Sequence, residues 1–187
     1  LTVRYVAQTG DATILDETAA FIEGPKVPLG EEGRMMTPRP SRDSATLVGH
    51  CMRSIDHVLA RMGRHGLPLM GTGDWDDGMN LVGGEGRGES GWMGFFLPDT
   101  LVRFADPIET RGDDPNAARY RAEASQLASA LGATWDEDRF IRAYNDEGKV
   151  IKPMSAMTSA WPALSGAIPH ARALAACENA PAELDKG

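Results

Sequence analysis

The 187 residues suffice for one domain with a substantial core, and 42% hydrophobic and 25% charged residues are ordinary values for a globular protein. The net charge of −8 argues against a nucleic-acid or anionic-membrane partner. No apolar run reaches the roughly 18 residues of a membrane span. The two cysteines form neither a disulfide framework nor a zinc pattern. We therefore expect no membrane contact from this segment and a cytoplasmic location.

Helical patterns begin at the start of the chain. Because Leu1 already stands in such a pattern, we expect residues 1–187 to be a single partial domain of a longer protein. Residues 44–62 place apolar side chains on one helical stripe, and Gly63 is the predicted C-cap. The members of that stripe are Leu47, Cys51, Ile55, Val58, Leu59 and Met62.

Residues 23–43, which precede the helix predicted for 44–62, are rich in proline and glycine. It is long for a connection, which predicts a functional or mobile segment rather than a simple loop. The strand-like alternation of apolar and polar residues is almost absent here and elsewhere in the chain.

Two longer helices are expected next. Residues 90–105 are strongly apolar, but Pro98 stands inside them and predicts a break or restart near Leu97. Asp114 followed by Pro115 has the pattern of a helix start, and Gly132 is expected to end that helix.

The last part of the chain also reads as short helices. Residues 136–144 are predicted to form one, residues 144–150 a turn or small hairpin, and residues 154–166 and 169–179 two more helices. Short loops between amphipathic helices together predict an all-α array.

The most unusual stretch is GTGDWDDGMN, residues 71–80, in which three carboxylates surround one tryptophan. A sugar has apolar C–H faces and a rim of hydroxyl groups, so a tryptophan face and carboxylate acceptors suit it. Cleavage of a glycosidic bond also needs a carboxylic acid to protonate the departing oxygen. Neighbouring negative charges raise a carboxyl pKa and keep one member protonated. The pattern therefore predicts carbohydrate chemistry.

Other interpretations of this stretch remain open. Asp74, Asp76 and Glu85 have the spacing of EF-hand ligands, although Met79 stands where that loop needs glycine. The glycines at 86, 88 and 91 match G-x-G-x-x-G, but no predicted strand precedes them. A purely structural acidic turn around a packed tryptophan is the third alternative. No metal site is predicted, since the histidines and cysteines lack ligand spacing.

The long motif HGLPLMGTGDWDDGMN (65–80), followed by EGRGESGWMGFFL (85–97), resembles the glycoside hydrolase family 94 phosphorylases. The likeness is greatest to the C-terminal region of cyclic β-1,2-glucan synthases and to 1,2-β-oligoglucan phosphorylases. It implies part of an (α/α)6 barrel and inverting phosphorolysis of a β-glucoside to α-glucose 1-phosphate. Inorganic phosphate is then a co-substrate, with no cofactor, and a β-glucan oligosaccharide is the partner.

The resemblance also implies residue roles. Asp77 becomes the general acid, Trp75 contacts the sugar, and Asp74 shapes the loop or binds a hydroxyl group. Asp76 is a further substrate-binding candidate. Arg87 and Glu89 are candidates either for supporting the residues that touch the sugar or for binding the acceptor sugar, with a surface Arg–Glu ion pair as the alternative.

Departures from the family pattern shape the remaining expectations. Asp76 replaces the usual asparagine, so its charge should raise the pKa of the acid or disturb the loop. The family's phosphate-binding histidines lie downstream of this region, and its Arg and Asp for the reacting sugar lie upstream. An incomplete active site is therefore expected, and a non-catalytic sugar-binding or regulatory remnant is the alternative function. Family phosphorylases are often dimers, so a homodimer of the longer protein is a further expectation, as is membrane association through distant segments.

Overall fold

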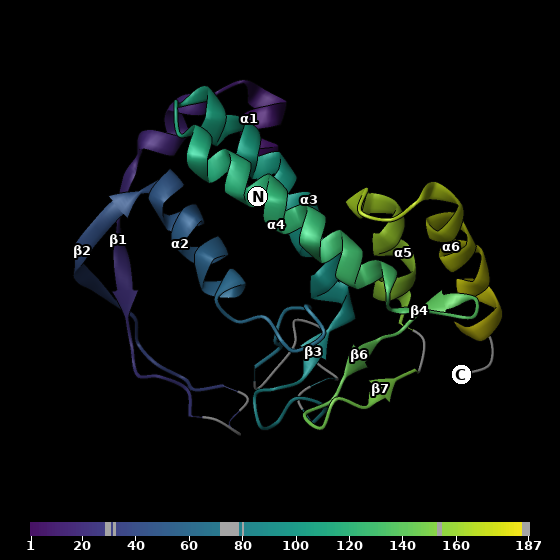
Figure 1. The fold of residues 1–187 in the computed structure, drawn as a ribbon. Helices are drawn as coiled ribbons and strands as arrows, with labels where there is room; N and C mark the ends of the chain where they lie inside the picture. Colours follow the sequence, from purple (N-terminus) through teal and green to yellow (C-terminus); the bar gives the residue numbers. More distant parts are fainter. Residues whose placement is uncertain (29–30, 32, 72–78, 80, 153–154, 185–187) are drawn as a thin grey trace.

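The computed structural model describes residues 1–28, 31, 33–71, 79, 81–152 and 155–184. Six α-helices and one 3-10 helix form the body of this part of the chain (Figure 1). The helices are α1 (Thr2–Thr9), η1 (Ala12–Asp16), α2 (Leu47–Leu59), α3 (Gly91–Thr110), α4 (Asp114–Gly132), α5 (Ala156–Ser165) and α6 (His170–Leu184).

Small antiparallel sheets accompany the helices, so the expectation of an all-α array is only partly met. Their strands are β1 (Thr18–Glu23), β2 (Arg39–Thr46), β3 (Glu89–Ser90), β4 (Trp135–Asp136), β5 (Arg139–Phe140), β6 (Ala143–Tyr144) and β7 (Val150–Ile151). In the described residues β1 pairs with β2, β4 pairs with β5, and the remaining three form a sheet in the order β3–β6–β7.

The long helices α3 and α4 pack side by side through the middle of the molecule, with α1 and α2 toward one end and α5 and α6 toward the other (Figure 1). Their shared face is the main hydrophobic core. Its fully buried members include Phe95, Leu101, Phe104, Ile108, Tyr120 and Leu131. Asp113 caps α4 by accepting from the N–H of Asn116. The predicted helix start at Asp114 and Pro115 is therefore confirmed, with the cap one residue earlier.

The expected break near Leu97 is wrong, because α3 runs unbroken through both Pro98 and Pro107. An interior proline removes one hydrogen bond and costs about 3 kcal/mol in an isolated helix. Here Leu97 and Pro98 are both buried in the interior of the protein. Gly94 lets α3 approach its neighbours closely, since a Cβ there would lie 3.0 Å from a Leu131 methyl carbon. Packing of the buried face outweighs the local penalty.

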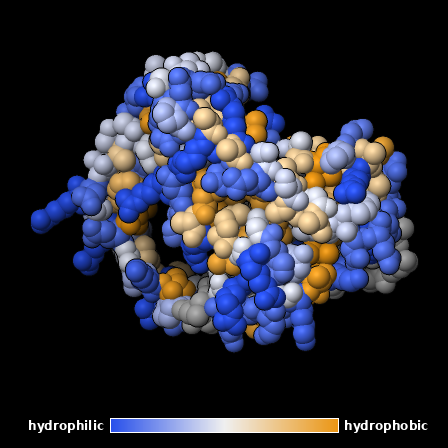
Figure 2. Space-filling model, in the orientation of Figure 1, coloured by the Kyte–Doolittle hydropathy of each residue, from blue (hydrophilic) through white to orange (hydrophobic). Residues whose placement is uncertain are grey.

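The near absence of strands predicted from the sequence is also wrong for residues 18–46. Strands β1 and β2 form an antiparallel ribbon in which Thr18 pairs with Thr46 and Glu23 pairs with Arg39. Most of its residues are exposed on both faces, so neither strand carries an alternating apolar pattern. Figure 2 shows open space between this ribbon and the helical body. The predicted long connection, 23–43, is shortened by the pairing.

Residues 135–151 form two tight hairpins rather than the helix predicted for 136–144. In the first hairpin, Glu137 adopts a left-handed conformation with φ 57°, and the strands β4 and β5 pair on either side. In the second, β6 and β7 pair around a turn with Gly148 at φ 76°. That second hairpin confirms the prediction for 144–150.

Helix α2 begins after Thr46, whose hydroxyl accepts from the N–H of Gly49, and it ends at Leu59. The predicted C-cap at Gly63 is wrong, since the chain leaves the helix earlier and Gly63 opens a turn instead. The helices predicted for 154–166 and 169–179 are confirmed as α5 and α6. Within the described ranges, every helix is too short or too polar to cross a bilayer.

Candidate functional site

Backbone pairing closes the loop that contains GTGDWDDGMN. The N–H of Met70 donates to the carbonyl oxygen of Gly88 over 2.9 Å, and a β-bridge forms one residue further out on either side. We call the two segments joined in this way, residues 68–71 and 82–90, the loop base. The two segments that flank the motif are therefore joined to each other by backbone hydrogen bonding.

The four predicted residues of the motif lie outside the described residues: Asp74, Trp75, Asp76 and Asp77. The residues on either side of them are well packed. Met70 and Met79 are both buried and belong to one hydrophobic cluster with Ala143 of β6. Close backbone approach adds to this packing, since a Cβ on Gly83 would lie 2.7 Å from the Met70 side chain and 3.2 Å from the carbonyl oxygen of Gly71.

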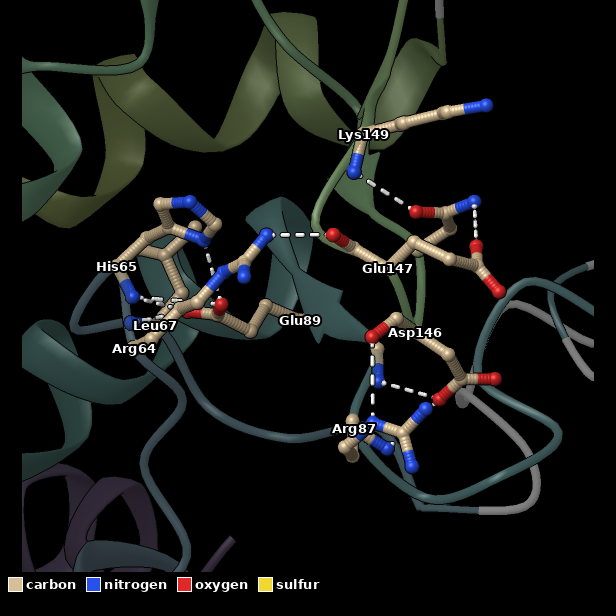
Figure 3. A network of polar contacts seen from close by, with 10 residues as sticks. Arg64, His65, Leu67, Arg87, Glu89, Asp146, Glu147 and Lys149 are labelled. Carbon is tan, nitrogen blue, oxygen red and sulfur yellow. Dashed lines mark hydrogen bonds and ion pairs between the residues drawn. The ribbon is translucent and has the colours of Figure 1, made fainter.

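Glu89 is the most buried charged residue at the loop base, with 2% of its surface exposed. Its carboxylate accepts hydrogen bonds from the backbone N–H groups of His65 and Leu67, each at 3.1 Å. It also lies 2.6 Å from Nδ1 of the His65 ring (Figure 3). Gly63 leaves the room for it, because a Cβ there would lie 2.2 Å from the Glu89 carboxyl carbon. The alternative of a surface ion pair between Arg87 and Glu89 is therefore wrong.

The His65 ring connects this carboxylate to the β6–β7 hairpin. It stacks on Tyr144 of β6, with ring centroids 3.7 Å apart and an interplanar angle of 15°. Burial raises the pKa of Tyr144, and the negative charge of Glu89 raises it further. Glu89, His65 and Tyr144 thus form a layered contact between the turn at 63–67, strand β3 and strand β6.

Asp146 holds the other side of the loop base. Its carboxylate accepts from the backbone N–H group of Arg87 at 2.8 Å (Figure 3). It also accepts from the backbone N–H groups of Glu85 at 2.9 Å and Gly88 at 3.1 Å. Burial alone would raise its pKa, but the three N–H donors and the Arg87 charge lower it overall. Sequence reasoning missed this residue, because Asp146 and Arg87 are 59 positions apart. The Asp in the predicted 144–150 turn was the only available signal.

Arg87 lies at the surface, with 60% of its side chain exposed. Its guanidinium forms an ion pair with Glu85, and Nε donates to the Asp146 carbonyl oxygen over 3.3 Å. The carboxylate of Glu85, one of the EF-hand candidates, is thus engaged by arginine. In the part of the chain that the structure describes, His, Cys, Asp and Glu side chains form no group of three able to hold a metal ion.

A pocket of 240 Å³ lies between the loop base and the β6–β7 hairpin. It is lined by Gly63, Arg64, Leu69, Arg87, Glu89, Asn145, Asp146 and Gly148. Arg64 crosses to the hairpin, where one guanidinium nitrogen donates to the carbonyl oxygen of Glu147 over 2.6 Å. The wall therefore combines charged and amide side chains with Leu69 and two glycines, and its residues come from three separate segments, 63–69, 87–89 and 145–148.

Comparison with known families identifies the domain type. Residues 1–186 match the family model described as the glycosyl hydrolase 94 superfamily, catalytic domain. The chain belongs to this family. The resemblance inferred from the motif at 65–80 is confirmed at this level, and the loop base described above is a part of a family 94 catalytic domain.

Several known proteins resemble this family 94 chain. The cyclic beta-(1,2)-glucan synthase NdvB of Rhizobium meliloti (strain 1021) is 35% identical over 188 residues, which cover 96% of this chain and 7% of that protein. The solabiose phosphorylase of Paenibacillus borealis is 30% identical over 149 residues, or 79% of this chain and 17% of that protein. The chain therefore spans less than a fifth of the length of either relative.

A solved structure supports the fold. The GH78 family rhamnosidase of Bacillus sp. GL1 superposes with a TM-score of 0.59 over 71% of this chain and 14% of that one, at 21% sequence identity. At this identity the likeness concerns the arrangement of the helices and not the chemistry.

Proposed function

We propose that this chain is part of the catalytic domain of an inverting phosphorylase that cleaves β-glucosidic bonds with inorganic phosphate. The observation that carries the proposal is the family 94 match across residues 1–186, together with the intact motif at 71–80. The anchored loop base supports it, because a catalytic acid needs a loop whose position is fixed. The proposed architecture of the longer domain is an (α/α)6 barrel.

Asp77 is the proposed general acid. It gives its proton to the glycosidic oxygen as the bond from that oxygen to the anomeric carbon breaks. A phosphate oxygen attacks the same carbon from the opposite face, so the product is α-glucose 1-phosphate. Asp76 supplies a neighbouring negative charge that raises the pKa of the acid. Phosphate takes the place of base-activated water, so the reaction needs only this one catalytic carboxylate.

The proposed substrate is a β-1,2-linked glucan oligosaccharide. Support comes from the relative named as a cyclic beta-(1,2)-glucan synthase, which aligns with 96% of this chain. Trp75 is proposed to pack against the sugar ring at the reacting position, and Asp74 to bind a hydroxyl group. Arg87 is exposed beside the 240 Å³ pocket, where it can donate to hydroxyl groups of the acceptor sugar.

Glu89 is proposed to act differently from the other site residues. Its carboxylate is buried and already bound by His65 and Leu67, so a direct contact with substrate would require those bonds to break. We assign it the task of holding the loop base rather than a sugar hydroxyl group.

The test is release of glucose 1-phosphate from β-1,2-gluco-oligosaccharides and phosphate, using the longest reading frame that contains this chain. Asp77→Asn should abolish release and leave sugar binding in place, whereas Trp75→Ala should weaken binding by about 1 kcal/mol. Asp43→Asn is the matched control, since Asp43 is an exposed carboxylate on β2 far along the chain from the motif.

The outcomes separate the two candidate functions. Release that disappears only in Asp77→Asn supports the phosphorylase. Sugar binding without release from β-1,2 or β-1,4 substrates supports the sugar-binding or regulatory remnant instead. Unchanged release in Asp77→Asn would remove Asp77 from the role of acid.

A further inference from the structure

Asp146 makes five hydrogen bonds to one side of the loop base. Its carboxylate accepts from the three N–H groups of Glu85, Arg87 and Gly88. Its own N–H donates to the carbonyl oxygen of Val82 over 3.2 Å, and its carbonyl oxygen accepts from the Arg87 side chain. One residue of the β6–β7 hairpin thus engages both the start and the end of segment 82–88.

This segment also fixes the residues next to the motif. Gly83 lies against Met70 and Gly71, which directly precede the undescribed residues. Gly88 accepts the hydrogen bond from the Met70 N–H at 2.9 Å. Gly88 itself packs on Gly83, since a Cβ at Gly88 would lie 2.6 Å from the Gly83 Cα. A shift of segment 82–88 must therefore move the residues on which the motif is anchored.

The carboxylate has no equal substitute in this position. Three N–H groups converge on its two oxygens, and a carboxylate offers about four lone-pair sites with a full negative charge. Asparagine offers one acceptor oxygen and places an NH₂ group where a second acceptor is needed. Alanine leaves all three N–H groups without this acceptor.

We propose that Asp146 is a positioning residue that locks the loop base and thereby sets the placement of the catalytic loop. This inference rests on the proposed function, since it assigns the lock to the loop that bears the proposed acid, Asp77. Asp146 does not touch the reacting atoms in this role. It acts through its hydrogen bonds to segment 82–88, in which Gly83 lies against Met70 and Gly71 and Gly88 accepts from the N–H of Met70.

The test combines two measurements on the longest reading frame that contains the chain. Amide hydrogen exchange of peptides covering 82–88 measures, without any substrate, how firmly Asp146 holds this segment. Steady-state phosphorolysis of β-1,2-gluco-oligosaccharides reports its effect on turnover. The variants are Asp146→Ala and Asp146→Asn. The control is Asp138→Ala, which removes a half-exposed carboxylate from the neighbouring β4–β5 hairpin, where it pairs with the adjacent Arg139.

In Asp146→Ala, exchange at 82–88 should become about tenfold faster or more, because charge-assisted hydrogen bonds are lost. The kcat should fall by about 10- to 100-fold, as expected for a misplacement near 1 Å, with KM nearly unchanged. Asp146→Asn should show smaller changes in both the exchange rate at 82–88 and kcat than Asp146→Ala. Asp138→Ala should leave exchange at 82–88 and kcat at the wild-type values.

Two results would overturn the proposal. Unchanged exchange in Asp146→Ala would show that the carboxylate does not hold segment 82–88. Faster exchange with an unchanged kcat would show that Asp146 holds segment 82–88 but does not position the catalytic loop. Absence of phosphorolysis in the wild type would instead refute the proposed function, and with it the positioning role. The exchange data would still show whether Asp146 holds segment 82–88.

Discussion

Replacing the buried Glu89 with alanine should destabilise the fold more than replacing an exposed carboxylate of the loop base such as Glu85. The side chain is 2% exposed and accepts from the N–H groups of His65 and Leu67 and from the His65 ring. Each buried N–H left without an acceptor costs about 1–3 kcal/mol. Two such groups give a loss of about 2–6 kcal/mol, in line with the cost of breaking a buried charged contact.

The measurement is urea unfolding of the chain followed by circular dichroism, analysed for the free energy of unfolding and for its slope with urea. Glu89→Gln keeps the size of the side chain and one acceptor oxygen, so it should lose less than Glu89→Ala. The control is Glu85→Ala. Glu85 lies nearby but 63% of its side chain is exposed, and an exposed pair with Arg87 contributes at most about 1 kcal/mol.

A loss below about 1 kcal/mol in Glu89→Ala, at an unchanged urea slope, would refute this reasoning. It would mean that water or a rearranged turn satisfies the N–H groups of residues 65 and 67. Equal losses in Glu89→Ala and Glu85→Ala would likewise show that burial of the carboxylate is not the decisive factor.

The remaining predictions concern the core, two glycines and pH. Leu101→Ala should lose about 2–5 kcal/mol of unfolding free energy, because the side chain is fully buried; Val102→Ala, at a half-exposed neighbour, should lose far less in the same urea titration. Gly91→Ala should lower the melting temperature, since its Cβ would lie 2.7 Å from a backbone carbonyl oxygen, whereas Gly132→Ala, with open space around it, should not. The folded-state pKa of Asp146 lies below its ordinary value of 3.8, so its stabilisation is complete above that value and is lost as pH falls through the lower folded value. Acid titration of unfolding should therefore be flatter in Asp146→Asn than in the wild type, and identical curves would contradict the assignment.

Helices with a clear apolar stripe were predicted correctly from the sequence. The stripe in 44–62 became α2, and the Asp–Pro start and terminal glycine located α4 within one residue. These signals depend on residues three or four positions apart, so they need no knowledge of the rest of the fold. The hairpin at 144–150 was predicted for the same reason, from its local turn residues.

The wrong secondary-structure predictions concern segments whose structure depends on contacts between residues far apart in the chain. Pro98 predicts a broken helix locally, but burial of α3 between α4 and α5 keeps it continuous. The β1–β2 ribbon carries no alternating pattern because both of its faces are exposed. Residues 136–144 resemble a helix in composition, yet pairing of short strands on either side of Glu137 gives a hairpin.

For the functional site, the sequence alone determined the family and predicts carbohydrate chemistry for the motif, because a run such as GTGDWDDGMN carries its residue types whatever surrounds it. Only the tertiary structure decided that Glu89 is buried against His65 and that Asp146 holds segment 82–88. Burial and hydrogen bonding between residues far apart in the chain depend on how the helices and hairpins pack, and no local pattern in the sequence encodes that packing.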